Sequence, residues 1–366
     1  MMKKINYLLL LILSIAGFTS CEKDKIEEKP GAFANGIYVI NEGNWGQGNA
    51  SVSFVNKDLD KVENNIYEST NDVALGDLAQ SIGFSGENAY IVVSSSQKIE
   101  VVDRNSMEHI ATISSGLNNP RYFLSTDSNT ALVSCWGDAI DSSDDYLAIV
   151  DINSNIVTGE IPVALGPEKM TKNDDYLFVA HQGARGTNNK ISVYDLVLKD
   201  VVQEIEVGYR PNSMVIHDNY LWVMCSGEIE YDPDTYEIIY ETAGQLYKID
   251  INDNFNIVQT FDFETTQHPA LLTLDNNNLY YYVNGTSYGS GDIYKMNIND
   301  TNLPASNFFD SFTPYNMEAY DGKLYLTDAK YFEQEGEIVV FDANNGTEIA
   351  RQTVGIIPGD IGFNFE

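Results

Sequence analysis

The sequence predicts an all-β fold, a seven-bladed β-propeller in which three N-terminal strands and one C-terminal strand close the first blade. The 366-residue chain is rich in Tyr, Asn, Asp and Gly, a composition typical of short strands and tight turns, and it lacks helical periodicity. Three sequence markers also recur at roughly 45-residue intervals, the length typical of a four-stranded propeller blade.

The first marker is a proline that opens an apolar strand, where the missing N–H breaks no ladder hydrogen bond. It occurs at Pro120, Pro167, Pro211, Pro269, Pro314 and Pro358. The second is an Asp or Asn that ends an apolar strand: Asn56, Asp103, Asp151, Asp195, Asp250, Asn297 and Asp342. The third is an aromatic or apolar strand that follows a polar turn, at residues 37–39, 89–91, 131–133, 177–179, 221–223, 279–281 and 324–326. Together the markers indicate seven units.

Each unit is completed by a fourth strand, for example at residues 109–113, 156–161 or 201–207. The chain enters the first unit at an aromatic strand (residues 36–41) and leaves on a proline-led strand (residues 358–363). The first blade is therefore expected to take its innermost strand from the C-terminal end, which removes a free sheet edge. We expect that removal of the last ten residues unfolds the ring.

Residues 1–20 have the pattern of a secretory signal peptide. Lys3 and Lys4 precede an apolar run that is too short to span a bilayer, and small residues lead into Cys21. This arrangement resembles a lipobox, so we expect Cys21 to be lipidated. Residues 21–34 are highly charged at their start and are predicted to be a flexible tether, which leaves residues 35–366 for the propeller.

The chain is strongly acidic, with a formal net charge of −33. Such a surface repels nucleic acid and anionic lipid, so we expect no nucleic-acid partner and membrane contact through the lipid alone. Cys135 and Cys225 each end an apolar run. They are interpreted as buried, unpaired thiols, with a disulfide as the alternative.

One face of a propeller carries the loops that lead into the innermost strands and those that join the second and third strands. The ligand-binding candidates predicted to lie on this face are Asn44, Trp45, Asp77, Gln80, Arg121, Tyr122, Trp136, His181, Arg185, Arg210, Tyr288, Tyr315, Asn316 and Tyr331. Their aromatic rings suit stacking on a ring-shaped ligand.

Three of the five arginines, Arg121, Arg185 and Arg210, fall on this face. Either they form a fork for a phosphate, carboxylate or amide group of a ligand, or they make structural ion pairs with nearby acids. Residues 228–243 form a Tyr-rich insertion in the fifth blade, which serves either as a contact surface or as a simple hairpin extension.

The sequence contains no positive signal for catalysis. The four histidines are scattered, and neither a nucleophile elbow nor a glycine-rich phosphate loop is present. The acidic run at residues 138–145 lacks EF-hand spacing and is interpreted as a solvated loop in preference to a calcium site. We therefore expect no enzyme activity, no metal and no cofactor.

Several segments resemble the surface propeller lipoproteins of gut Bacteroidetes. They are the Asn41-Glu42-Gly43-Asn44 and Gly48-Asn49-Ala50-Ser51 tetrapeptides, residues 75–81, Pro120-Arg121-Tyr122, and residues 354–359. These proteins belong to the YVTN/YncE-like group and include the BtuG-type cobalamin-capture proteins. The resemblance implies an outer-membrane lipoprotein, exposed on the cell surface, that passes a corrinoid to a TonB-dependent transporter.

Two other functions stay open. A lactonase-type hydrolase shares this architecture and would need His181, Arg185 and Glu42 to converge at the channel mouth. A glycan-binding or adhesion protein would use the same exposed aromatic side chains.

Overall fold

The chain folds as a seven-bladed β-propeller, as the sequence predicts. The computed structural model describes residues 31–141, 143–285 and 289–365, so the predicted signal peptide, Cys21 and Tyr288 lie outside the described residues. Residues 31–366 form one compact unit, and Phe33 is buried in it ahead of the first strand. No helix in the described part of the chain is long and apolar enough to cross a membrane.

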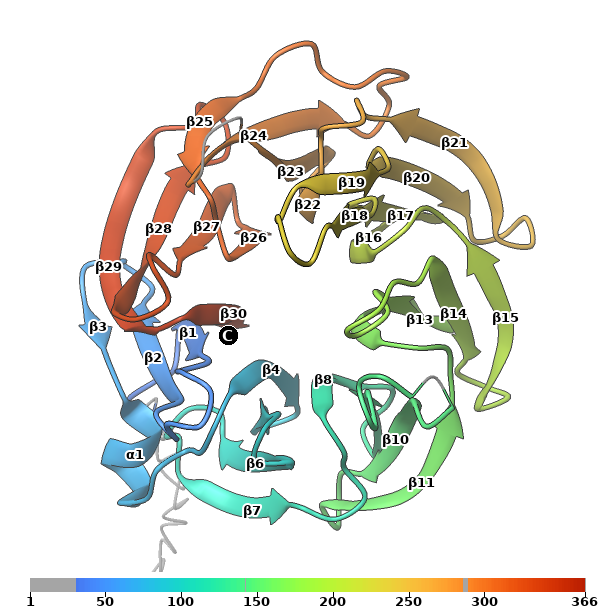
Figure 1. The fold of residues 1–366 in the computed structure, drawn as a ribbon. Helices are drawn as coiled ribbons and strands as arrows, with labels where there is room; N and C mark the ends of the chain where they lie inside the picture. Colours follow the sequence, from blue (N-terminus) through green and yellow to red (C-terminus); the bar gives the residue numbers. More distant parts are fainter. Residues whose placement is uncertain (1–30, 142, 286–288, 366) are drawn as a thin grey trace, which may run out of the picture. The chain divides into compact units, whose positions relative to one another are not determined.

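Seven four-stranded antiparallel sheets surround a central channel (Figure 1). From the channel outward, blade 1 contains β30 (Pro358–Asn364), β1 (Gly36–Asn41), β2 (Ser51–Asn56) and β3 (Val62–Glu63). Blade 2 contains β4 (Ala79–Ser85), β5 (Asn88–Val93), β6 (Lys98–Asp103) and β7 (His109–Ile113). Blade 3 contains β8 (Pro120–Ser125), β9 (Thr130–Cys135), β10 (Tyr146–Asp151) and β11 (Ile156–Pro162). Blade 4 contains β12 (Pro167–Lys172), β13 (Tyr176–His181), β14 (Lys190–Asp195) and β15 (Asp200–Glu206).

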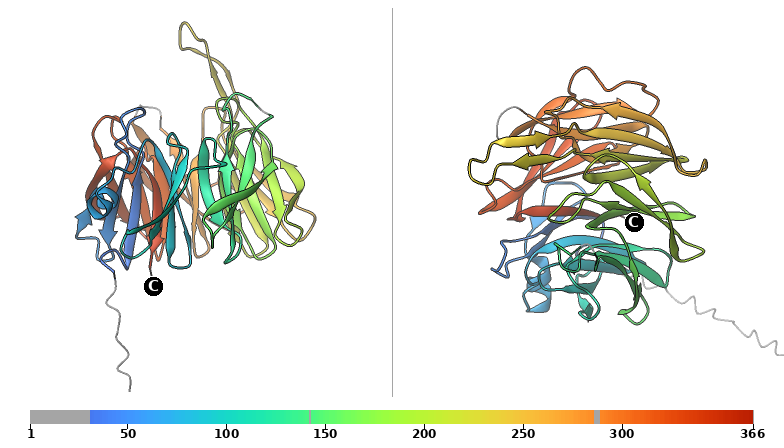
Figure 2. Two further views of the ribbon diagram at one scale, coloured as in Figure 1. Left: turned by 90° about the horizontal axis from the view of Figure 1, so that it is seen from below. Right: turned by 45° about the vertical axis from the view of Figure 1, so that its right-hand side comes forward.

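The last three blades follow the same order. Blade 5 contains β16 (Pro211–His217), β17 (Tyr220–Cys225), β20 (Gln245–Asp250) and β21 (Asn256–Asp262). Blade 6 contains β22 (Ala270–Asp275), β23 (Asn278–Asn284), β24 (Ser290–Asn297) and β25 (Phe309–Phe312). Blade 7 contains β26 (Asn316–Tyr320), β27 (Lys323–Asp328), β28 (Glu335–Asp342) and β29 (Glu348–Ile356). A separate two-stranded sheet, β18 (Ile229–Tyr231) and β19 (Ile238–Glu241), projects from blade 5 (Figure 2).

The ring closes as the two chain ends predict, because β30 pairs with β1. Asn364 reinforces this closure: its side-chain amide donates hydrogen bonds to the carbonyls of Phe33 and Arg104, both at 2.8 Å. The sequence does not predict the short helix α1 (Ile66–Asn71), which stands after the two-residue strand β3 and buries Ile66 and Tyr67. Helix α1 thus covers part of the outer side of blade 1.

The core consists of apolar side chains between neighbouring blades. For example, the blade 2 and blade 3 strands bury Tyr90 and Phe123, whose rings stack with centroids 4.1 Å apart. Cys135 and Cys225 are buried, free thiols, which confirms their interpretation as small core residues.

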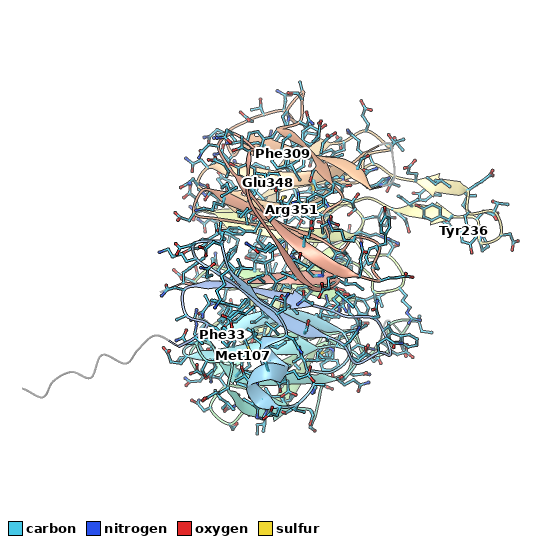
Figure 3. The ribbon with its side chains drawn as sticks, turned by 90° about the vertical axis from the view of Figure 1, so that its left-hand side faces the viewer. Phe33, Met107, Tyr236, Phe309, Glu348 and Arg351 are labelled. Carbon is cyan, nitrogen blue, oxygen red and sulfur yellow. The ribbon has the colours of Figure 1, made fainter. Side chains whose placement is uncertain are left out.

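The loops between second and third strands lie on one face of the ring, which we call the mouth face. The described chain starts on the opposite face, where the Phe33 amide donates to the Asn105 carbonyl in the β6–β7 turn. Figure 3 shows Phe33 on one side of the ring and Tyr236, at the tip of the β18–β19 hairpin, on the other.

Candidate functional site

Bulges at the start of the innermost strands place polar side chains beside the channel. In blade 3, Pro120 pairs with Cys135 but Phe123 pairs with Val133, so Arg121 and Tyr122 together face one partner residue. The same irregularity in blade 4 accommodates Glu168 and Lys169. Because a bulge redirects side chains, the residues that follow these prolines turn toward the ring axis.

Arg121 is held on two sides. Its Nε lies 3.1 Å from a carboxylate oxygen of Glu168, and its guanidinium carbon lies 4.0 Å from the centroid of the Trp136 ring. Burial raises the pKa of the Glu168 carboxyl, an effect that Arg121 opposes. Arg121 and Trp136 therefore build the wall of the channel mouth, and the structural ion-pair interpretation holds for this arginine.

Side chains from opposite blades meet across the channel below the mouth. The Nζ of Lys169, in blade 4, lies 3.4 Å from the Oδ1 of Asn316 and 3.5 Å from a carboxylate oxygen of Glu318, both in blade 7. Asn316 donates to Asp360 at 3.3 Å, and Asp360 accepts the backbone N–H of Ile82 at 3.0 Å. These bonds link blades 4, 7, 1 and 2, so side chains bridge the channel at this depth.

Two acidic residues of this region have pKa values raised above the usual carboxyl range. Burial raises the pKa of Glu42 to about 7, against the opposing effects of Arg121 and the Tyr315 hydroxyl. Burial also raises the pKa of Asp360 to about 6, while Lys169 opposes the shift. The Tyr122 hydroxyl, which bonds to Gln80, has a pKa raised well above its usual value by burial and by the Glu168 carboxylate. The mouth therefore lies above a buried, partly neutralised acidic cluster.

A pocket of about 610 Å³ opens between blades 6 and 7, next to the channel mouth. Five aromatic side chains contribute to its lining: Tyr282, Phe312, Tyr315, Tyr331 and Phe332. Lys330 also lines the pocket, but its ammonium group contacts the carboxylates of Asp328 at 2.9 Å and Glu337 at 2.6 Å. The pocket thus has a mainly apolar lining with several aromatic rings, and the charge of Lys330 is already compensated.

The loop after β1 joins this pocket to the next blade. The side chain of Asn44 donates to the Phe332 carbonyl at 2.6 Å, and the Gly46 amide donates to Asp77 at 2.9 Å. Trp45 lies between these two attachments, and its side chain is 79% exposed. The loop therefore holds an exposed indole near the rim of the pocket.

The structure divides the predicted ligand-binding residues into three groups. Asn44, Trp45, Tyr315 and Tyr331 belong to the pocket and its rim, with Asp77 as the anchor of the loop. Gln80, Arg121, Tyr122, Trp136 and Asn316 form the wall and the cross-channel bonds. His181, Arg185 and Arg210 lie in blades 4 and 5, and Tyr288 is outside the described residues.

The three residues of blades 4 and 5 differ in exposure and in their bonding partners. His181 is 0% exposed; its Nε2 lies 2.8 Å from the Ser192 hydroxyl, and burial lowers its pKa to about 4. Arg185 is exposed and Arg210 is partly buried, and neither forms an ion pair with a described residue. Glu42, the third member of the hydrolase set, bonds instead to Tyr315 at 3.1 Å.

The described residues contain no group of three or more His, Cys, Asp or Glu side chains that could hold a metal ion. In the acidic run at residues 138–145, Asp145 is buried and accepts the Gly166 N–H at 2.7 Å, which makes it a structural residue of the loop.

Sequence reasoning missed Glu168, Lys169, Glu318 and Asp360. A signal for the first two is present, since they follow Pro167 in the same way that Arg121 and Tyr122 follow Pro120. Asp360 likewise comes two residues after Pro358. The one or two residues after Pro120, Pro167 and Pro358 therefore mark the channel wall.

Comparison with known proteins supports the fold. The periplasmic gluconolactonase PpgL of Pseudomonas aeruginosa is 13% identical, with a TM-score of 0.62, over 89% of this chain and 99% of that chain. A functionally unknown protein from Desulfotomaculum acetoxidans is 12% identical, with a TM-score of 0.60, over 91% and 99% of the two chains. No curated protein sequence matches the chain.

These low identities establish the propeller architecture alone. The family described as "Domain of unknown function (DUF5074)" matches residues 35–357, nearly the whole of the propeller. The chain therefore belongs to the DUF5074 family.

Proposed function

We propose that this protein is a lipid-anchored, surface-exposed protein of the outer membrane that captures a small ring-bearing nutrient on the mouth face. The proposed ligand is a corrinoid such as cobalamin, which the protein passes to a TonB-dependent transporter. The observation that carries the proposal is the aromatic pocket between blades 6 and 7, together with the exposed rim residue Trp45.

The chemistry of the pocket suits such a ligand. A pocket of about 610 Å³ lies within the range that small-molecule sites occupy, and five aromatic rings offer faces for an apolar ring system. A corrinoid is a large ring edged with amides, so one part of it would fill the pocket while the remainder would extend over the rim at Asn44 and Trp45.

The charge of the site favours a ligand with few negative groups. Lys330 is compensated by Asp328 and Glu337, and the wall of the channel contains several carboxylates. A ligand with many neutral amides and a single phosphate meets this condition better than a polyanion does.

The described chain begins on the face opposite the mouth, where Phe33 packs beside the β6–β7 turn. No described residue ahead of β1 therefore occupies the aromatic pocket.

A hydrolase of the lactonase type is less well supported. Such an enzyme would need His181, Arg185 and Glu42 to converge, but His181 is buried against Ser192 while Glu42 bonds to Tyr315. The gluconolactonase shares the fold at 13% identity, which supports the common architecture alone.

The test is a calorimetric titration of residues 31–366 with cyanocobalamin. We expect one-to-one binding that a Trp45→Ser substitution weakens, whereas Val197→Ser, in an exposed turn of the opposite face, leaves it unchanged. An absence of heat at micromolar protein would discard the corrinoid. Binding of oligosaccharides in its place would assign the same aromatic pocket to glycans.

A further inference from the structure

The hairpin formed by β18 and β19 stands apart from the body of the propeller. It connects the second and third strands of blade 5 and projects from the mouth face (Figures 2 and 3). Its two strands form a sheet of their own and pair with no blade strand. An isolated two-stranded hairpin is only marginally stable in water, so its order in this chain depends on local bonds.

Both ends of the hairpin are fixed by hydrogen bonds. At the base, the ring nitrogens of His268 lie 2.7 Å from a Glu241 oxygen and 2.8 Å from the Ser226 carbonyl. At the tip, the side chain of Asp232 accepts the N–H groups of Asp234 and Thr235, and the Tyr236 amide donates to the Asp232 carbonyl. The hairpin therefore has a defined conformation at both its base and its tip.

The hairpin nevertheless leaves its large apolar side chains in water. Tyr236 is 79% exposed, and the side chains of Tyr231, Ile238, Ile239 and Tyr240 are also exposed. Tyr231 and Ile238 are paired across the two strands, and a concentration of exposed apolar side chains of this kind typically marks a protein contact. Six acidic residues accompany it between positions 228 and 241, without any Lys or Arg in that segment.

We propose that this hairpin docks onto a partner protein that offers an apolar cleft bordered by lysine and arginine side chains. The isoleucines and tyrosines would fill the cleft, and the carboxylates would pair with its basic border. Electrostatic complementarity of this kind orients a complex and speeds its formation. The inference does not depend on which ligand the pocket holds.

A second copy of this chain is a poor docking partner for the hairpin. Two such hairpins carry the same negative charge and repel each other. The aromatic pocket of another copy lacks a basic border, since Lys330 is paired with Asp328 and Glu337. A lipid surface is equally unsuitable, because the carboxylates among the apolar side chains would lose their hydration on insertion.

The first experiment places a photo-crosslinking amino acid at Tyr236 of the full-length chain in the cells that produce it. Mass spectrometry then identifies the crosslinked peptide. We expect a partner protein whose crosslinked segment combines apolar residues with Lys or Arg. A crosslinker at Val197, which is 83% exposed on the opposite face, serves as the control and should not capture that partner.

The second experiment measures the affinity of the purified pair. Ile238→Ser with Ile239→Ser should weaken binding about tenfold or more, and Glu230→Lys with Glu237→Lys should do the same. The matched controls, Val197→Ser with Leu198→Ser and Asp174→Lys with Asp175→Lys, should leave the affinity unchanged. All variants should unfold at the temperature of the unaltered protein.

Four outcomes would overturn the inference. They are a Tyr236 crosslink to another copy of this chain alone, a crosslink to lipid alone, no crosslink above the Val197 control, and equal loss of affinity in the control variants.

Discussion

The Tyr315 hydroxyl donates a hydrogen bond to the Glu42 carboxylate at 3.1 Å. Tyr315 lines the aromatic pocket between blades 6 and 7, whereas Glu42 belongs to the loop that follows β1 in blade 1. Asn44 of the same loop donates to the carbonyl of Phe332, whose ring contacts the ring of Tyr315. The pocket and the channel mouth are therefore parts of one surface, and a change in either should alter ligand binding.

Replacement of Tyr331 by alanine should weaken ligand binding about tenfold, because loss of an exposed aromatic platform costs on the order of 1 kcal/mol or more. Tyr331 is 73% exposed, so the same change should leave the thermal transition of the free protein unchanged. Calorimetric titration with cyanocobalamin measures the first quantity, and a thermal melt measures the second. A Tyr331→Phe variant, which keeps the ring, should bind normally; weakened binding by this control would argue against stacking.

Stability should fall as the pH rises from about 4 to 7. The pKa of Glu42 is raised to about 7 and that of Asp360 to about 6, both above the values of the unfolded chain. The folded state therefore binds more protons, so the stabilisation is complete below the unfolded pKa values and is lost as the pH passes through the folded ones. We expect a loss on the order of 2 kcal/mol in the free energy of unfolding.

Urea denaturation at several pH values tests this dependence. Glu42→Gln should make the curve flatter, whereas Asp174→Asn, at an exposed turn, should not. A curve for Glu42→Gln as steep as that of the unaltered protein would assign the pH dependence to other groups.

Arg121→Met should destabilise the protein by about 3 kcal/mol, because it leaves the buried Glu168 carboxylate without its partner. The double variant Arg121→Met with Glu168→Leu removes both charges and should recover much of this loss. Denaturant titration of the three proteins gives the comparison. Equal stability of the single variant and the unaltered protein would show that the ion pair is not required for the wall.

Deletion of residues 357–366 should abolish the cooperative thermal transition. The deletion removes β30, which pairs with β1 along its length, and it also removes Asn364, which bonds to Phe33 and Arg104. Loss of the innermost strand opens blade 1 and exposes a sheet edge. Calorimetry of the truncated chain should show no sharp transition, and a transition close to that of the full ring would refute the closure argument.

Much of the fold is predictable from local patterns in the sequence. The proline, aromatic and Asp markers each indicate one strand of the blade. Their shared period gives the number of blades and the way in which the two chain ends close the ring. Helix α1 escapes prediction because it is only six residues long and replaces part of an outer strand whose burial pattern is weak.

The candidate site is less predictable, because its contacts join residues that are far apart in the sequence. Sequence position places Arg121 on the mouth face but does not reveal Glu168 as its partner or Trp136 as its support. His181 ends strand β13 and looks exposed by position, yet its imidazole turns into the blade and bonds to Ser192. The direction of a side chain at a strand end depends on packing from neighbouring blades.

The most direct test of the proposed site is hydrogen–deuterium exchange of residues 31–366, free and saturated with cyanocobalamin. We predict slower exchange in the loop at residues 42–46 and in the segments at residues 312–315 and 328–332, which surround the pocket. The turns of the opposite face, such as residues 196–199, should exchange at an unchanged rate. Protection confined to that opposite face, or no protection at saturating ligand, would contradict the assignment of the mouth face as the binding surface.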